Sequence, residues 1–387
     1  MKKKKAVLLD NNVFSQEGFT NGIFLTFREF FKRFEKARID TAILSLSEAE
    51  TSRIWDGKTF GRNTRIEKGI TVEEMIMNGN FSSNKKEFLA AIDKLLNESK
   101  PDLIFMYTPA VFFEESHILT LQKALQTKSK VVVLLADELY PTTKNHPGKN
   151  VDAYYKLLKQ TEVLCTSKNI IKKFKKEVGI EASFFPNIFS PNEVIAKAKE
   201  KKRKYITLVN HHPIKGIQIF NEIAKKMPKH NFLVVETWPD VPDYVPPSSN
   251  IHFSKFIDDV KTLYAKTKII IMPSLYEEGP SRLMIEGMLN HIPVIAHDIG
   301  SLSEVGKDFA IFIKPPQIKS SDMRGTIIYP KISENEKNDD VDRFVKKIEE
   351  IEENKFSQNY GELAYQKALE YCSIVDEKLA ILIKKWF

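Results

Sequence analysis

The chain has 387 residues, of which 42% are hydrophobic and 28% are charged. This length suits two ordinary globular domains, and the composition excludes an intrinsically disordered chain. Its two cysteines, Cys165 and Cys372, lie far apart, which excludes a disulfide framework or a zinc-ligand spacing and predicts a reducing, cytoplasmic environment. The apolar stretch after the lysines at 2–5 is too short for a signal peptide, so we expect none.

The formal charge of +8 is concentrated in the first half of the chain. Residues 1–200 carry 32 basic and 25 acidic side chains, against 27 and 26 in residues 201–387. A basic half suits an acidic partner such as an anionic membrane surface, and a lysine-rich surface without a partner explains the same charges equally well. We expect no nucleic-acid partner, because no nucleic-acid-binding motif is present.

Short apolar, β-branched segments alternate with amphipathic segments in the first half of the chain. The expected strands are residues 6–9, 41–46, 102–107, 130–135 and 162–166. The expected helices are residues 23–37, 117–125 and 168–178. Residues 52–80 break the alternation, because they are polar and hold four glycines, and we expect a long loop or a small hairpin there.

The second half repeats the alternation, which predicts parallel sheets joined by right-handed crossovers. The expected strands are residues 205–209, 232–235, 250–253, 269–272 and 293–296. The expected helices are residues 216–226, 258–266, one that begins at 281, and a helical segment from about 341. The apolar stripe of residues 375–387 should pack on the body of the chain.

Residues 269–304 form the most informative stretch, which predicts a strand, a loop, a helix and a second strand. In open parallel sheets the crevice at the carboxyl ends of the strands binds ligands, and the amides at the start of the following helix attract phosphate. Two carboxylates, Glu278 and Glu286, flank the loop and the first turns of this helix. The stretch therefore suits a phosphorylated, hydroxyl-rich ligand.

Three motifs occur in order: Phe185-Pro-Asn187, Lys215-Gly216 and Glu278-Gly-Pro-Ser-Arg-Leu-Met-Ile-Glu286. With these motifs, residues 160–310 resemble the nucleotide-sugar glycosyltransferases of family 4. The resemblance implies an α/β chain with the GT-B fold, in which two doubly wound, Rossmann-like domains face each other across a cleft. It implies an acceptor-binding domain at 1–190, joined by a helix at about 372–387, and a donor-binding domain at 191–371.

The resemblance also implies roles for the residues of these motifs. Glu286 should hydrogen-bond the ribose hydroxyls, Glu278 should face the donor sugar, and Lys215 should neutralise the diphosphate as a point charge. The remaining residues expected to contact the donor are Gly279, Pro280, Ser281, Leu283, Asn210, Gly22, Phe256 and Ile257.

The chain departs from the family pattern at two charged positions. Asn210 stands where relatives carry a phosphate-binding arginine, and Arg282 is the candidate replacement, with His211 or His212 behind it. The alternative is that Arg282 is a solvent-facing helix residue. Asp137 stands where relatives carry a histidine, and it either contacts sugar hydroxyls or the acceptor, or caps a loop.

The implied activity is that of a retaining hexosyltransferase that needs no metal ion and no cofactor. It would move a sugar from a UDP- or GDP-linked donor to a hydroxyl of a glycan, a lipid-linked sugar or a polymer in cell-surface polysaccharide or glycoconjugate synthesis. The acidic pair Asp258-Asp259 suits helix capping better than metal binding. We expect a cytoplasmic protein, with contact at the inner membrane face as an option. The alternatives are a nucleotide-sugar epimerase and a non-catalytic GT-B scaffold.

Overall fold

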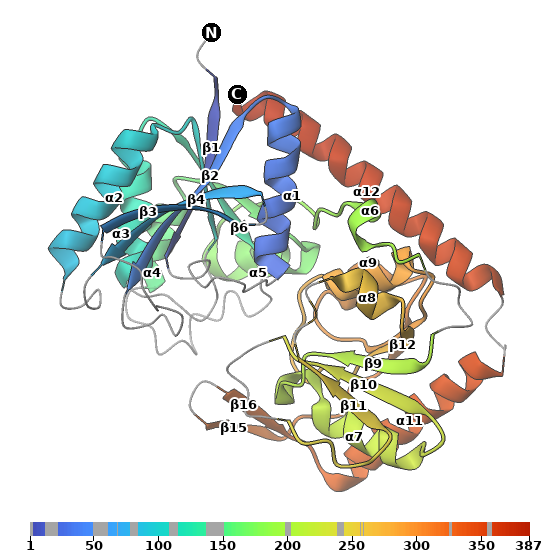
Figure 1. Cartoon of the computed structure of the whole chain (residues 1–387). Helices are drawn as coiled ribbons and strands as arrows, with labels where there is room; N and C mark the ends of the chain where they lie inside the picture. The colour runs from blue at the N-terminus through green and yellow to red at the C-terminus, as the bar shows by residue number, and fades with distance from the viewer. Residues whose placement is uncertain are drawn as a thin grey trace. The chain divides into compact units, whose positions relative to one another are not determined.

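The computed structural model in Figure 1 forms two compact units. We refer to Met1–Ile188 with Val375–Phe387 as the N-terminal unit and to Phe189–Ile374 as the C-terminal unit. The residues that the structure describes are 3–11, 22–48, 61–67, 69–77, 84–107, 115–136, 151–197, 203–237, 244–255, 257, 259–324, 327–353 and 358–387. Among them, no helix combines the length and the apolar character needed to cross a membrane.

The N-terminal unit is built on an eight-stranded sheet with the strand order β3-β4-β2-β1-β5-β6-β7-β8. The strands are β1 (Lys5–Asn11), β2 (Asp40–Glu48), β3 (Gly61–Glu67), β4 (Ile70–Met77), β5 (Leu103–Tyr107), β6 (Lys130–Leu135), β7 (Glu162–Cys165) and β8 (Ser183–Phe184). All neighbours pair in parallel except β3 and β4. The helices are α1 (Gly22–Lys36), α2 (Lys85–Ser99), α3 (Glu115–Leu125), α4 (Val151–Leu158) and α5 (Lys168–Val178).

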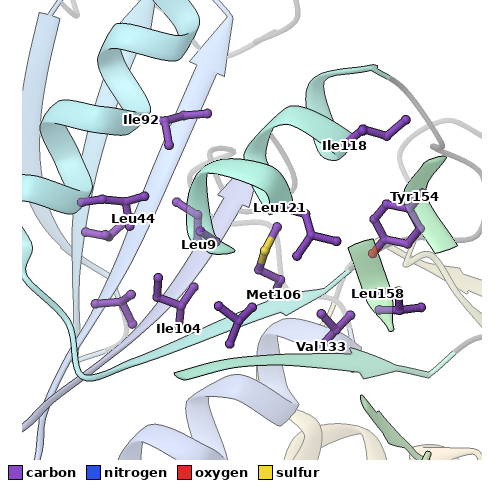
Figure 2. Packing of buried hydrophobic residues seen from close by; sticks show 14 of the residues in the cluster. Leu9, Leu44, Ile92, Ile104, Met106, Ile118, Leu121, Val133, Tyr154 and Leu158 are labelled. Carbon is purple, nitrogen blue, oxygen red and sulfur yellow. The ribbon is translucent and has the colours of Figure 1, made fainter. Parts of the chain in front are cut away.

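One face of this sheet is covered by aliphatic packing, which Figure 2 shows from close by. Leu44 of β2 and Ile104 of β5 belong to the same buried cluster as Ile92 of α2 and Leu121 of α3. Strands that are apolar at consecutive positions are typical of parallel sheets buried on both faces. The buried run Ala6–Leu9 of β1 follows this rule.

A second set of contacts in this unit is aromatic and includes the end of the long helix α12 (Gln358–Trp386). The Trp386 ring lies 5.4 Å from the Phe105 ring and 6.4 Å from the Phe34 ring of α1, measured between centroids. Its indole Nε1 donates a hydrogen bond of 3.2 Å to Glu162. The predicted packing of the stripe at 375–387 is therefore confirmed.

The C-terminal unit is built on a six-stranded, fully parallel sheet with the order β11-β10-β9-β12-β13-β14. The strands are β9 (Tyr205–Val209), β10 (Asn231–Val235), β11 (Ile251–Ser254), β12 (Thr267–Met272), β13 (Val294–His297) and β14 (Ile311–Ile313), with a separate antiparallel hairpin of β15 (Ser320–Arg324) and β16 (Ile327–Lys331). The helices are α6 (Pro191–Val194), α7 (Ile217–Lys226), α8 (Val260–Tyr264), α9 (Arg282–Leu289), α10 (Leu302–Gly306) and α11 (Glu334–Glu352), with the 3₁₀ helix η2 (Pro213–Lys215).

Helices cover both faces of this second sheet. Ile269 and Ile271 of β12 belong to one buried cluster with residues of α7 and α11. Ile270 and Met272 belong to another, with residues of α8 and α9. Successive side chains of a strand point to opposite faces, so the apolar run of β12 fills both layers. Figure 1 shows α8 and α9 apart from α7 and α11.

The strand order places a topological switch point between β9 and β12. The chain leaves β9 for β10 on one side, and β12 pairs with β9 on the other side. In open parallel sheets, ligands bind beyond the carboxyl ends of the strands at such a switch point. The candidate site lies at this edge.

The structure differs from the predicted elements in one segment that was left open and in several elements that were not predicted. The strands β3 and β4 form the hairpin alternative for the segment 52–80, and β4 also pairs in parallel with β2. The elements without a counterpart among the predicted ones are the helices α2, α4, α6 and α10, the strands β8 and β14, and the hairpin β15–β16.

Candidate functional site

Two glycines let three loops approach closely at the carboxyl edge of the C-terminal sheet. Gly216 ends η2 with a φ of 81°, and a Cβ there would overlap the carbonyl of Pro273 in the loop after β12. Gly300, after β13, has a φ of 62°, and a Cβ there would overlap the backbone of Glu278. Both positions therefore need glycine for conformation and for space.

Lys215 and Glu278 form a buried ion pair in this crowded edge. The lysine Nζ lies 2.7 and 2.8 Å from the two carboxylate oxygens and 3.0 Å from the hydroxyl of Tyr276. The side chains are 17% and 8% exposed, respectively. Burial acts to lower the pKa of Lys215, but Glu278 and then Tyr276 outweigh it and raise the pKa above its usual range. Lys215 therefore carries a positive charge at physiological pH.

Glu278 is held by three further contacts, one of which is a hydrogen bond of 3.3 Å from the hydroxyl of Tyr276 to its carboxylate. The Oγ of Ser274 donates a hydrogen bond of 2.5 Å to its carboxylate, and the amide of Ser301 donates one of 2.7 Å to its backbone carbonyl. The loops after β12 and β13 thus fix its backbone and its side chain together. These contacts hold the carboxylate of Glu278 in one orientation.

Glu286 lies on α9 and is 6% exposed. The hydroxyl of Tyr264, on α8, donates a hydrogen bond of 2.5 Å to Oε2, and the Nε of Arg282 lies 3.5 Å from Oε1. Burial and then the charge of Glu286 raise the pKa of Tyr264 well above its usual value. Tyr264 therefore keeps its proton and remains a donor to Glu286.

Arg282 is packed rather than exposed. Its Cζ lies 4.3 Å from the centroid of the Phe189 ring, and its side chain is 14% exposed. A guanidinium over an aromatic ring gains a cation–π attraction. The alternative that Arg282 is a solvent-facing helix residue is wrong. Its role as a phosphate clamp stays a prediction.

The conformation of the loop after β9 suits Asn210, which stands where members of the family carry an arginine. Asn210 has a φ of 78°, a conformation that asparagine tolerates better than most residues, and its Oδ1 accepts a hydrogen bond of 2.9 Å from the amide of His212. The Nδ1 of His212 in turn accepts from the amide of Ile214 at 3.2 Å, which caps η2.

His212 cannot add positive charge to this loop at neutral pH. Burial, followed by the charge of Lys215 and by His211, lowers the pKa of His212 to about 4. The expectation that His211 or His212 stands behind Arg282 at the phosphate stays a prediction. His211 packs against the rings of Tyr244 and Phe253, each 5.7 Å away between centroids.

The other residues predicted to contact the sugar donor lie in several different elements. Gly279, Pro280 and Ser281 lie in the loop between β12 and α9, and Leu283 and Ile257 pack against the apolar cluster that includes α9. Gly22 is the first residue of α1 in the N-terminal unit. The candidates outside the described residues are Asp137 and Phe256.

The capping alternative for the acidic pair is confirmed at its described member. The Asp259 side chain accepts a hydrogen bond of 3.0 Å from the amide of Lys261 at the start of α8. Over the parts of the chain that the structure describes, no three or more histidine, cysteine, aspartate or glutamate side chains gather as a metal site.

Tyr264, Ser274 and Tyr276 are not among the site residues predicted from the sequence. Ser274 and Tyr276 follow a predicted strand, and their place in the loop before Glu278 is the signal that points to them. Tyr264 precedes Glu286 by 22 residues on another helix, and no local pattern links the two.

Taken together, the edge holds two carboxylates, each beside a cation, at a switch point of parallel strands. Cations suit phosphate oxygens, and carboxylates accept hydrogen bonds from sugar hydroxyls. The geometry therefore suits a ligand that carries both groups.

Comparisons with known proteins agree with this geometry. Residues 203–320, which contain the whole candidate site of the C-terminal unit, match the family model described as "Glycosyl transferases group 1". No curated protein matches the chain in sequence.

Solved structures match the chain over its length. A glycosyltransferase from Rickettsia africae has a TM-score of 0.68 at 14% identity, covering 100% of this chain and 99% of that one. Anabaena HepE in complex with UDP-glucose has a TM-score of 0.70 at 15% identity, covering 98% and 99%. Sucrose-phosphate synthase from Thermosynechococcus elongatus has a TM-score of 0.69 at 11% identity, covering 99% of both. The chain therefore has the α/β GT-B fold of glycosyltransferases, and its segment 203–320 matches the glycosyl transferases group 1 model.

Proposed function

We propose that the protein is a nucleotide-sugar-dependent glycosyltransferase of family 4. The observation that carries this proposal is the pairing of Lys215 with Glu278 and of Arg282 with Glu286 at the switch point of the C-terminal sheet. The match of residues 203–320 to a glycosyltransferase family model supports it.

The leaving group of such a transfer is a nucleoside diphosphate, so negative charge develops on its phosphate oxygens as the glycosidic bond breaks. Fixed positive charge at that position stabilises the transition state more than the ground state. We assign this role to Lys215, which stays charged, and to Arg282. The carboxylate of Glu278 then accepts hydrogen bonds from hydroxyls of the donor sugar, and the carboxylate of Glu286 accepts hydrogen bonds from the ribose hydroxyls.

We further propose transfer of a hexose with retention of anomeric configuration, without a metal ion or a cofactor. Lys215 and Arg282 would supply the charge that a metal ion supplies elsewhere. The relatives in complex with UDP-glucose and with UDP-2-fluoro-glucose make UDP-hexoses the first donors to test, followed by GDP-hexoses.

We assign acceptor binding to the N-terminal unit. The acceptor class is a hydroxyl of a glycan, a lipid-linked sugar or a polymer in cell-surface polysaccharide or glycoconjugate synthesis. The excess of basic residues in the first half of the chain supports a contact with the anionic inner face of a membrane.

Calorimetric titration with UDP, GDP, ADP and their sugars tests the proposal on the wild-type chain and on two variants. Lys215→Gln keeps a hydrogen-bond donor and removes the charge, and Glu286→Gln keeps the shape and removes the carboxylate. We expect each to weaken donor binding by about 10- to 100-fold, the range for a hydrogen bond to a charged group. Lys225→Gln is the matched control, because this exposed lysine of α7 pairs with the partly exposed Glu222.

Three results would contradict the proposal. Near-wild-type turnover in both variants at limiting donor would exclude the assigned roles. Product formed from the donor alone would indicate an epimerase, and a wild-type chain that binds no nucleotide would indicate a scaffold. The anomeric configuration of the product by NMR, with and without EDTA, tests retention and metal independence.

A further inference from the structure

A buried pair of ionisable residues lies behind the candidate site. His297 ends β13, Asp340 lies on α11, and both are 0% exposed. The imidazole Nε2 lies 3.0 and 3.1 Å from the two oxygens of Asp340, and Nδ1 lies 2.8 Å from the backbone carbonyl of Ser274. Arg343 donates a further hydrogen bond of 3.0 Å to Asp340.

The chemistry of these atoms fixes the direction of the contact with Ser274. A carbonyl oxygen only accepts, so the Nδ1 of His297 is the donor. The Nε2 faces the carboxylate of Asp340, which also accepts the hydrogen bond from the guanidinium of Arg343. Asp340 thereby holds the orientation of the ring, as a carboxylate does behind many functional histidines.

Ser274, His297 and Asp340 have the residue types of a hydrolytic triad, but not its connections. The imidazole contacts the carbonyl of Ser274, and the Oγ of Ser274 donates instead to Glu278. A triad needs a bond between the imidazole and the Oγ. The set therefore has no activated nucleophile.

A chain of hydrogen bonds connects Asp340 of α11 to Glu278, the carboxylate that we assign to the donor sugar. His297 fixes the backbone of Ser274, and the Oγ of Ser274 fixes Glu278. The ring of Phe344, 5.2 Å from the imidazole between centroids, closes the pair off. We propose that His297, oriented by Asp340, is a positioning residue that holds the loop after β12 and thereby sets Glu278 for the donor sugar. The sugar-binding part of this inference rests on the proposed function.

Two substitutions of His297 separate positioning from packing. In His297→Asn the side-chain amide nitrogen takes the place of Nδ1, so the bond to Ser274 is kept and the contact with Asp340 is lost. In His297→Gln the amide takes the place of Nε2, so Asp340 keeps its partner and Ser274 loses its donor. Both variants lose the ring and its contact with Phe344. His230→Gln is a matched control, because His230 pairs with Glu352 on the same helix α11 without contacting Ser274.

Hydrogen exchange reports on the loop without any donor. The amide of Leu275, next to Ser274, donates to Ile214 at 2.7 Å. We expect its exchange to rise roughly tenfold or more in His297→Gln, the scale of one lost hydrogen bond, and to stay near wild type in His297→Asn and His230→Gln. Equal exchange in the two His297 variants would overturn the proposal.

Binding supplies the second measurement. In His297→Gln the affinity for the UDP-sugar that the wild type binds should fall roughly tenfold, while the affinity for UDP alone should change by less than about threefold, because Glu278 faces the sugar. An equal loss for both ligands would overturn the positioning of Glu278. A wild-type chain without nucleotide affinity would instead overturn the proposed function, while the exchange of Leu275 would still report the positioning of the loop.

Discussion

Burial and neighbouring charges together determine which side chains of the candidate site are charged. Lys215 stays protonated because Glu278 and Tyr276 outweigh its burial, whereas His212 stays neutral because burial and Lys215 act in the same direction. The two residues are three positions apart, and of these two only the lysine carries a positive charge at neutral pH. A neutral His212 can then accept from the amide of Ile214, which a protonated ring could not do.

The lowered pKa of His212 predicts an acid-dependent loss of stability. Between its ordinary pKa of 6.5 and its folded pKa of about 4, the unfolded chain takes up a proton that the folded chain does not bind. Above pH 6.5 the titration of His212 therefore costs the folded chain little. As the pH is lowered from 7 to 5, it reduces the free energy of unfolding by about 2 kcal/mol.

The variant His212→Asn isolates this effect, since an asparagine Oδ1 can accept from Ile214 and does not titrate. We expect the variant to lose about 2 kcal/mol less than the wild type between pH 7 and pH 5. The measurement is the unfolding free energy of the C-terminal unit, from hydrogen exchange of the β12 amides. The same pH dependence in both proteins would contradict the prediction.

At the scale of elements, helix α5 carries several of the exposed basic residues of the first half of the chain. Its buried residues are Ile170 and Phe174, and the exposed lysines of the helix are Lys168, Lys172, Lys175 and Lys176. An amphipathic helix with lysines on its polar face attracts anionic lipid, each basic residue near the surface contributing about 1 kcal/mol. We therefore place the proposed membrane contact on α5.

Reversing two of these charges tests the contact. The double variant Lys172→Glu with Lys176→Glu should bind vesicles of anionic phospholipid on the order of 30-fold more weakly than the wild type, measured by co-sedimentation. A control with the same change in charge reverses two other exposed lysines, Lys225 on α7 and Lys229 in the turn that follows this helix. Equal losses in both double variants would show that only net charge matters, and the contact would not lie on α5.

Most strands were predictable from the sequence because each is a short apolar run that fills both layers around a parallel sheet. The hairpin β15–β16 was not predicted because Ser320–Arg324 is mostly polar. Its residues do not alternate between apolar and polar as those of a half-buried strand do. In the site, Lys215, Glu278 and Glu286 were found through their motifs. His297 and Asp340 are separated by 43 residues and meet only through the packing of α11 on the sheet, which no local pattern encodes.

At the scale of the whole molecule, one unit is made of two distant parts of the chain. The segment Val375–Phe387 belongs to the N-terminal unit, although it follows all of the C-terminal unit in sequence. Val375 and Leu379 of this segment are 1% and 0% exposed, and Trp386 completes the aromatic cluster of Phe34 and Phe105.

Removing the indole should destabilise only the N-terminal unit. Trp386→Ala deletes a side chain of a residue that is 7% exposed, and such changes cost about 3–5 kcal/mol. Hydrogen exchange followed by mass spectrometry should show faster exchange in β1 and β5 and unchanged exchange in β9 and β12. Leu363→Ala on the same helix is the control, since Leu363 is 55% exposed and its loss should cost less than about 0.5 kcal/mol. A uniform change in both units would contradict this division.

The return of α12 to the N-terminal unit has a consequence for biosynthesis. A ribosome makes β1 and α1 first, but the aromatic cluster of this unit stays open until residues 375–387 have emerged. At about 5–20 residues per second, translation of the intervening segment 189–374 takes roughly 10–40 s. During that time Phe34 and Phe105 lack their tryptophan partner, while the C-terminal unit can already fold. The half of the chain that is made first is thus the last to close its core.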